Sequence, residues 1–176
     1  IGENLSYRRS SGVSVSDGVV ASYVHGAVAP NMGKIGVLVG LESTGDKAKL
    51  AEFGKQLAMH IAAANPIWVS QDEVDTDAVD REREVLADQA REAGKPEEIV
   101  QKMVDGRLRK YYEEVCLLDQ TFVIDGESKV SKAVEAAAAD VGAPLKITAF
   151  ARVQLGEGIE KEESDFAAEV AATAGA

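Results

Sequence analysis

The sequence predicts an α+β fold: a small three-stranded antiparallel sheet with helices packed on one face, a protruding antiparallel helical hairpin and a C-terminal helix. Three observations lead to this prediction. Two β-rich runs flank residues 26–33, a connection that begins and ends with glycine. Residues 145–154 alternate with the period of two that marks a half-buried strand. Residues 76–115 contain two charged helical stretches around a Gly/Pro break.

The composition indicates one ordinary globular unit and narrows its partners. Of 176 residues, 45% are hydrophobic and 28% are charged, which suits one core or a core with an appendage. The net charge of −11 argues against direct nucleic-acid binding, because phosphate binding needs clustered Lys and Arg. An acidic body suits either a basic patch on a protein partner or simple solubility, and the composition leaves both open.

Cysteine usage and hydropathy predict a cytoplasmic protein that makes no contact with a membrane. Cys116 is the single cysteine, so there is no internal disulfide framework and no sign of secretion. No apolar run approaches the ~20 residues that span a bilayer, and no signal peptide is visible. The chain opens with Ile1-Gly-Glu-Asn4 and lacks an initiator methionine. We therefore expect a fragment whose N-terminal part is missing.

The first two predicted strands are the centre of the sheet. In the first strand, alternate residues from Val19 to Tyr23 face one side. His25 stands at the end of this strand, and Gly26 begins the long connection. The second strand is the nearly unbroken apolar run 35–41, so the two runs should pair as antiparallel neighbours.

Residues 46–64 are predicted to form a helix that packs on the sheet. Its large apolar residues fall on one stripe by helical spacing: Leu50, Phe53, Leu57 and Ile61. Most of the remaining circumference is uncharged, which is typical of a helix covered on more than one side. Pro66 ends the helix at Asn65. His60 flanks the stripe and is more readily a satisfied histidine at the edge of the core than a ligand.

Residues 67–115 are predicted to form a helical hairpin outside the main core. Ser70-Gln-Asp-Glu73 has the form of a capping box, and helices at 76–93 and 97–115 follow, joined by a tight Gly94-Lys-Pro96 turn. A thin apolar seam runs between them: Val79, Leu86, Val100, Val104, Leu108 and Tyr111. A narrow seam flanked by charges is typical of coiled coils, so the hairpin should pack against a partner or stand out as an arm.

The remaining residues return the chain to the core and then leave it. A helix is expected at 128–140, and Gly142-Ala-Pro144 ends it. The strand 145–154 follows, with one face expected to consist of Leu145, Ile147, Ala149, Ala151 and Val153. A final helix at 159–172 carries Ile159, Phe166, Ala167 and Val170.

No catalytic or metal-binding constellation emerges from the sequence. His25 and His60 lack the spacing of helical zinc ligands, and one cysteine provides no zinc set. Gly156-Glu-Gly158 follows a strand but lacks the third glycine of a nucleotide-binding fingerprint. The many carboxylates lie on helix faces at solvating spacings. We therefore expect no enzyme, no cofactor and no metal.

Eight short strings, spread over essentially the whole chain, coincide in order with one known family. They are Ile1-Gly-Glu-Asn4 with Arg8-Arg9, Ser22-Tyr-Val-His-Gly26, Ile35-Gly-Val-Leu-Val39, Ala58-Met-His-Ile-Ala62 with Pro66, Gly94-Lys-Pro96, Lys102-Met-Val-Asp-Gly-Arg107, Gly156-Glu-Gly-Ile-Glu-Lys161 and Asp165-Phe-Ala-Ala-Glu-Val170. Each string is weak alone. Together, in register, they resemble bacterial elongation factor Ts.

The resemblance implies a guanine-nucleotide exchange factor for elongation factor Tu, the GTPase that delivers aminoacyl-tRNA. It divides the chain into a remnant of the first core subdomain (1–16), a second core subdomain (17–66 and 116–155), a coiled-coil dimerisation hairpin (67–115) and a C-terminal module (156–176). The family's N-terminal domain and its Thr-Asp-Phe motif, which disturbs the magnesium site of the GTPase, do not occur in this sequence. We therefore expect the chain to retain affinity for the GTPase and to lose exchange.

The resemblance also implies which residues bind the partner. His25 matches the family histidine at the tip of the second core subdomain, and Tyr23 and Gly26 are expected beside it in the interface. The C-terminal helix is expected to contribute Ile159, Phe166 and Val170. An amphipathic ring at a strand end suits insertion into a partner pocket, whereas the residues alone favour a histidine that merely caps the loop. The hairpin seam implies a homodimer as a further assembly.

Two functions stay open on these grounds. The first is an exchange factor, which binds the nucleotide-free GTPase better than the nucleotide-bound form. The second is a binding or assembly module of the same fold without exchange activity. The upstream sequence would discriminate them by showing or lacking Thr-Asp-Phe.

Overall fold

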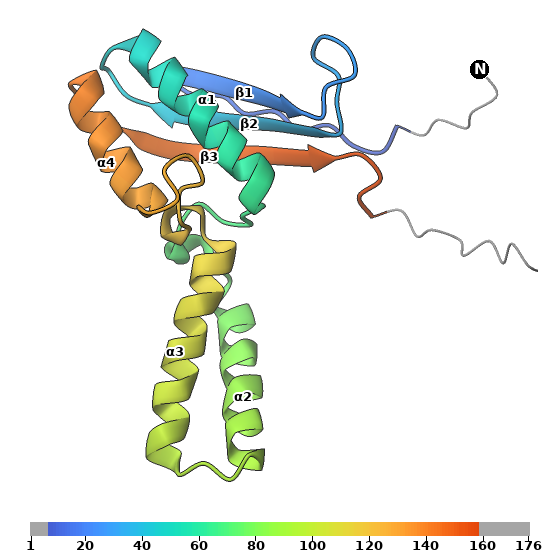
Figure 1. The fold of residues 1–176 in the computed structure, drawn as a ribbon, viewed down its shortest axis with the longest axis vertical. Helices are drawn as coiled ribbons and strands as arrows, with labels where there is room; N and C mark the ends of the chain where they lie inside the picture. Colours follow the sequence, from blue (N-terminus) through green and yellow to red (C-terminus); the bar gives the residue numbers. More distant parts are fainter. Residues whose placement is uncertain (1–6, 159–176) are drawn as a thin grey trace, which may run out of the picture.

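A computed structural model describes residues 7–158 of the chain. In chain order, the described elements are β1 (Gly18–His25), β2 (Ile35–Glu42), α1 (Lys47–Ala64), η1 (Gln71–Glu73), α2 (Thr76–Glu92), α3 (Glu97–Val115), η2 (Leu117–Asp119), α4 (Val130–Val141) and β3 (Lys146–Gln154). Figure 1 shows α1 and α4 over one face of the sheet, with α2 and α3 projecting away from it. The predicted α+β class and protruding hairpin are confirmed. The helix predicted at 159–172 lies outside the described residues.

The sheet is antiparallel with the strand order β1-β2-β3, so β2 is its central strand. β1 and β2 pair along their whole length, from Gly18 opposite Glu42 to His25 opposite Ile35. Strands on both sides and α1 on one face cover β2, and Val37, Val39 and Leu41 are buried. Leu38, which lies between these buried residues, is half-buried, and this fits the nearly continuous apolar run in the sequence.

β3 contains a β-bulge that the sequence pattern does not reveal. Leu41 of β2 lies opposite Ile147, whereas the preceding Gly40 lies opposite Ala149. Thr148 is therefore an extra residue in β3, and its hydroxyl donates a hydrogen bond to the Gly40 carbonyl at 3.3 Å. Because side chains alternate with a period of two, one extra residue moves all following side chains to the opposite face.

The bulge overturns part of the predicted face assignment of β3. Leu145 and Ile147, which precede it, pack on the core as predicted. Beyond it, Phe150 packs on the core, and the Arg152 guanidinium donates to the carbonyl of Ala62 at 3.5 Å. The assignment of the later residues to the core face is therefore wrong; these residues are Ala149, Ala151 and Val153.

α1 begins and ends at the residues that the sequence indicates. The Asp46 carboxylate caps the helix by accepting hydrogen bonds from the backbone N–H groups of Ala48 (2.8 Å) and Lys49 (3.2 Å). At the other end, Asn65 adopts a left-handed conformation with φ 50° and its N–H donates to the Ile61 carbonyl. All four residues of the predicted stripe are buried.

Gly54 lets α1 approach the sheet closely. A Cβ at this position would lie 2.7 Å from the Ala21 Cβ of β1 and 3.1 Å from Leu41 Cδ1 of β2. Real Cβ atoms do not approach other carbons to 2.7 Å, so any larger residue would push the helix off the strands. The distance between helix and sheet therefore depends on this glycine.

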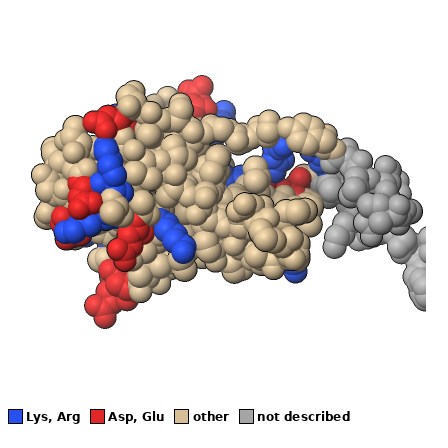
Figure 2. Space-filling view, turned by 90° about the horizontal axis from the view of Figure 1, so that it is seen from above, with Lys and Arg blue, Asp and Glu red and all other residues tan. Residues whose placement is uncertain are grey.

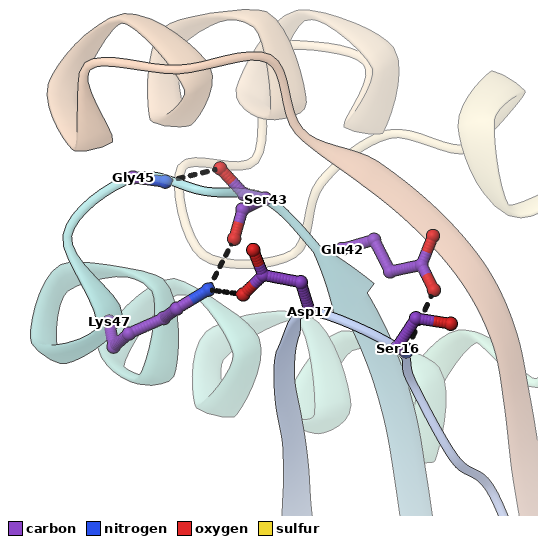
Figure 3. A network of polar contacts seen from close by, with 6 residues as sticks. All are labelled: Ser16, Asp17, Glu42, Ser43, Gly45 and Lys47. Carbon is purple, nitrogen blue, oxygen red and sulfur yellow. Dashed lines mark hydrogen bonds and ion pairs between the residues drawn. The ribbon is translucent and has the colours of Figure 1, made fainter.

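A polar network fastens the segment before β1 at the end of the sheet opposite the β1–β2 connection (Figure 3). The Ser16 N–H donates to Glu42 Oε1 at 3.0 Å. The Lys47 ammonium donates both to the Asp17 carboxylate and to the Ser43 carbonyl. The side chains of the Lys47–Asp17 ion pair are largely exposed, so we expect the pair to orient the segment more than to stabilise the fold.

The hairpin of α2 and α3 has a core of its own. Five of the six predicted seam residues are buried between the two helices, and Tyr111 is half-buried against them. The buried residues of the hairpin and its base form one cluster, and those of the sheet with α1 and α4 form another. The hairpin is therefore held together chiefly by contacts within itself.

The start of the hairpin differs from the prediction. Ser70 makes no side-chain cap, and Glu73 instead accepts a hydrogen bond from the Val69 N–H at 3.0 Å. The prediction of a capping box at 70–73 is therefore wrong. These residues form the short turn η1, and Asp75 caps α2 by accepting from the Asp77 N–H at 3.1 Å.

The base of the hairpin is joined to the body by backbone hydrogen bonds between two parallel segments, residues 67–69 and 115–118. The Ile67 N–H donates to the Val115 carbonyl at 2.8 Å, and the Leu117 N–H donates to the Trp68 carbonyl at 2.8 Å. Gln120, which is buried, donates from its side-chain amide to the Glu114 carbonyl at 2.7 Å. The last turn of α3 is thereby tied to the loop that enters the body.

We propose that the hairpin is a separate unit and predict that the body folds without it. Deleting residues 71–113 and closing the gap with a short glycine linker should leave a folded sheet domain, because the two cores are distinct. Near-UV circular dichroism and a cooperative thermal transition would measure this. An insoluble or molten product would show that the hairpin belongs to the main core.

Within the described residues, no helix combines the length and apolar character needed to cross a membrane.

Candidate protein-binding site

His25 is the exposed last residue of β1, at the end of the sheet from which the long connection extends. Its Nδ1 lies 3.2 Å from the Tyr23 hydroxyl, and the two ring centroids are 6.1 Å apart. The ring of Tyr23 packs against the core, so it is a fixed neighbour. When the hydroxyl donates to Nδ1, the neutral imidazole carries its proton on Nε2, which makes that nitrogen a donor toward solvent or a partner.

Two glycines close the connection tightly beside His25. Gly26 has φ +62°, a conformation that side chains disfavour. A Cβ on Gly33 would lie 2.5 Å from Val24 Cγ1 and 2.7 Å from the His25 carbonyl oxygen. That carbonyl accepts a hydrogen bond from the Lys34 N–H at 2.9 Å. The backbone around His25 is therefore fixed on both sides.

The tip of the connection presents large apolar side chains to solvent. The Val28 N–H donates to the Met32 carbonyl at 2.9 Å, and the Met32 N–H donates to the Ala29 carbonyl at 3.0 Å. These bonds hold a compact turn in which Val28 is 78% exposed and Met32 is 62% exposed. Exposed apolar side chains beside polar ones are typical of a contact surface.

Tyr23, His25 and Gly26 were predicted partner-binding residues, whereas Val28 and Met32 were not. The available signal was two large apolar residues in a connection otherwise made of small and polar ones. The structure brings the three named residues together at one end of the sheet. Three further predicted partner-binding residues lie outside the described residues: Ile159, Phe166 and Val170.

The predicted dimerisation residues lie in a different place. Val79, Leu86, Val100, Val104 and Leu108 are buried between α2 and α3 of the same hairpin. On the outer surface of the hairpin, Val85 and Ile99 are exposed apolar residues. The seam thus stabilises the hairpin itself, and a homodimer remains a proposal that would use its outer surface.

Cys116 and His60 are titratable residues that the structure buries. In the part of the chain that the structure describes, no cluster of three or more His, Cys, Asp or Glu is placed to hold a metal ion. Burial, with Asp119 and Glu73 nearby, raises the pKa of Cys116 to about 11, so its thiol stays protonated and is a poor nucleophile. His60 is enclosed in the core and hydrogen-bonded at both ring nitrogens.

These features define an α+β protein whose candidate site is a contact surface, and comparison with known proteins identifies the family. A family model described as "Elongation factor TS" matches residues 1–157. The chain is 63% identical over 175 residues to elongation factor Ts of Rhodospirillum centenum and 62% identical over 175 residues to that of Paramagnetospirillum magneticum. Elongation factor Ts of Parvibaculum lavamentivorans is 63% identical over 174 residues.

The chain belongs to the elongation factor Ts family. The three alignments cover 99% of the chain but only 57%, 56% and 56% of the relatives. The chain thus spans a little over half the length of the curated relatives it matches.

Proposed function

We propose that this chain is the partner-binding part of a cytoplasmic translation elongation factor that acts on elongation factor Tu. The observation that supports the proposal most directly is the exposed imidazole of His25, oriented by Tyr23 on a rigid strand end. Val28 and Met32, on the connection that follows His25 in the chain, are further exposed apolar residues. A polar ring on a fixed backbone suits an anchor that enters a pocket of a partner protein.

The proposed mode of action is nucleotide exchange by differential binding, without covalent chemistry. A protein that binds the nucleotide-free GTPase more tightly than the nucleotide-bound form lowers the nucleotide affinity by the same factor. This requires only a surface that distinguishes two states of the partner. In this proposal Ile159, Phe166 and Val170 add a second contact to that of His25. Neither a cofactor nor direct contact with nucleic acid takes part.

We predict that His25→Ala weakens binding to elongation factor Tu without unfolding the protein. Binding should weaken by at least ~1 kcal/mol, about fivefold in Kd, because an anchoring ring is lost. The free energy of unfolding should change by no more than about 0.5 kcal/mol, because the ring is exposed. Titration calorimetry and urea denaturation measure the two quantities. Met59→Ala, an exposed position on α1, serves as the matched control and should change neither.

A titration against elongation factor Tu loaded with labelled GDP distinguishes the two candidate functions. Binding accompanied by faster GDP release assigns exchange to this part of the protein. Binding without faster release is the expected result, because the Thr-Asp-Phe motif does not occur in this sequence, and it assigns binding without exchange to this part of the protein. Absence of binding, or binding that His25→Ala leaves intact, overturns the proposed role of this surface.

A further inference from the structure

A groove of about 600 Å³ lies between three segments that are distant in the sequence. Residues 7–9 form one wall, the β1–β2 connection forms the second, and the turn after β3 forms the third. Its largest exposed apolar side chains are Tyr7, Val28, Met32 and Leu155, and Tyr7 and Leu155 are 82% and 80% exposed. We refer to it as the terminal groove. Figure 2 shows Lys and Arg side chains gathered beside a hollow at this end of the molecule.

The terminal groove is basic although the protein is acidic. Its lining contains Arg8, Arg9 and Lys34 but only one acidic residue, Glu157. Arg9 and Glu157 form an ion pair across the groove's rim. The whole chain, by contrast, carries a net charge of −11. An occupant that combines apolar side chains with negative charge would complement this groove best.

We propose that residues 159–176 of the same chain occupy the terminal groove in the free protein. This segment contains five acidic residues and a single basic one, Lys161. Its large apolar residues recur at helical spacing, at Ile159, Phe166 and Val170. The segment therefore offers an apolar stripe for the apolar lining and negative charge for the basic lining, in which Arg9 is already paired with Glu157.

β3 ends at the rim of the terminal groove, so the segment that follows it in the chain starts there. The Leu155 N–H donates to the Lys34 carbonyl at 2.8 Å, which holds the chain against the β1–β2 connection. Gly156 and Gly158, with φ +79° and +71°, then turn the chain. From Gly158 to Phe166 the chain spans roughly 12 Å as a helix and up to roughly 28 Å when extended. Either length suffices for Phe166 to reach side chains that line the same groove.

The proposed docking within the chain does not rest on the proposed function, but it would affect how the chain binds a partner. A short tether keeps the local concentration of the segment in the millimolar range, so even a weak contact is populated. The apolar stripe cannot be buried in the groove and in a partner at once. Partner contacts made by Phe166 and Val170 would therefore compete with the docked state.

Hydrogen exchange on the full chain, read by mass spectrometry, tests the proposal. Replacing Phe166 with Asp should speed the exchange of backbone amides in residues 28–34 at least fivefold, because the segment no longer covers them. Met32→Asp should in turn speed exchange in residues 160–170. Val85→Asp, at an exposed apolar position on α2, is the matched control and should alter neither region. If neither the Phe166 nor the Met32 substitution changes the rate of hydrogen exchange in these two regions, the proposal is wrong.

Two further experiments distinguish the C-terminal segment from other possible occupants of the terminal groove. Protection that falls when the protein is diluted identifies a second copy of the chain as the occupant and overturns intramolecular docking. In the Cys116→Ser background, cysteines at Met32 and Phe166 should form a disulfide within one chain, whereas cysteines at Val85 and Phe166 should not. Equal cross-linking of both cysteine pairs would show that the segment does not bind specifically in the terminal groove.

Discussion

Replacing His60 with alanine is expected to lower the free energy of unfolding by about 2–4 kcal/mol. The ring is fully buried, and its Nε2 lies 2.9 Å from Gln120 Oε1. Its Nδ1 accepts a hydrogen bond from the Val123 N–H at 3.2 Å, and its face packs beside Phe122. The substitution leaves a cavity and two unpaired polar groups. Urea denaturation measures the loss, and His25→Ala, the exposed histidine, is the control.

The same network predicts a specific dependence of stability on pH. Burial lowers the pKa of His60 below its ordinary value of 6.5, with the Gln120 hydrogen bond acting in the opposite direction. Above about pH 6.5 the ring is neutral in both the folded and unfolded states. Below this pH the unfolded chain takes up a proton first, so the free energy of unfolding falls by up to about 1.4 kcal/mol per pH unit until the folded pKa is reached.

The comparison that isolates this effect is between the wild type and His60→Gln. The difference in stability between the two proteins should shrink as the pH is lowered from 7 to 5, because only the wild type carries the titrating ring. A difference that stays constant over this range would show that His60 does not couple protonation to folding. A protonated Nδ1 could no longer accept from Val123.

Gly54→Val is expected to destabilise the protein by about 3 kcal/mol, the second large effect. A Cβ at this position meets Ala21 Cβ at 2.7 Å, and the branched side chain adds two methyl groups to that clash. Neither the helix nor the paired strand can yield without opening the core around Leu41. The gain in helix propensity over glycine, roughly 0.5 kcal/mol, does not offset this.

Gly106 provides the matched control for Gly54. It lies within α3, and a Cβ there would meet nothing within 4 Å. Gly106→Val should therefore be neutral or slightly stabilising, by up to roughly 0.5 kcal/mol. Thermal denaturation of both variants separates the clash from the propensity. Equal destabilisation by the two substitutions would mean that the close approach of α1 to the sheet is not what Gly54 provides.

The sequence was a sufficient guide to most helix limits, where the structural signal is local, and the capping box predicted at 70–73 is the exception. The limits of α3 agree with the prediction, and α1 ends at Ala64, just before Asn65 and Pro66, as predicted. Such signals act within a few residues, through the backbone groups that a helix end leaves unpaired. The central strand was also predictable, because a nearly continuous short apolar run bounded by turn residues is typical of a buried strand.

Features that depend on partners far along the chain were not predictable. The bulge at Thr148 is fixed by pairing with Gly40, 108 residues earlier in the chain, and the alternation within β3 does not predict it. Gln120 is 60 residues from His60, and the sequence around Gln120 contains no pattern that predicts the hydrogen bond between the two side chains. At the candidate site, Tyr23, His25 and Gly26 were recognised through family resemblance. Their exposure and mutual orientation are results of the structure.

The hairpin is long and joins the body at its base, so a small rotation at the base moves the far end by a larger distance. α3 has 19 residues and is therefore about 28 Å long. A rotation of about 10° at its base displaces the tip at Gly94 by about 5 Å, a simple consequence of that length. The pivot is the parallel bridge between Trp68 and Cys116, and Gln120 hydrogen-bonds to the last turn of α3. Gln120 also hydrogen-bonds to His60, so a displacement of Gln120 that rotated α3 would be larger at the far end of the hairpin.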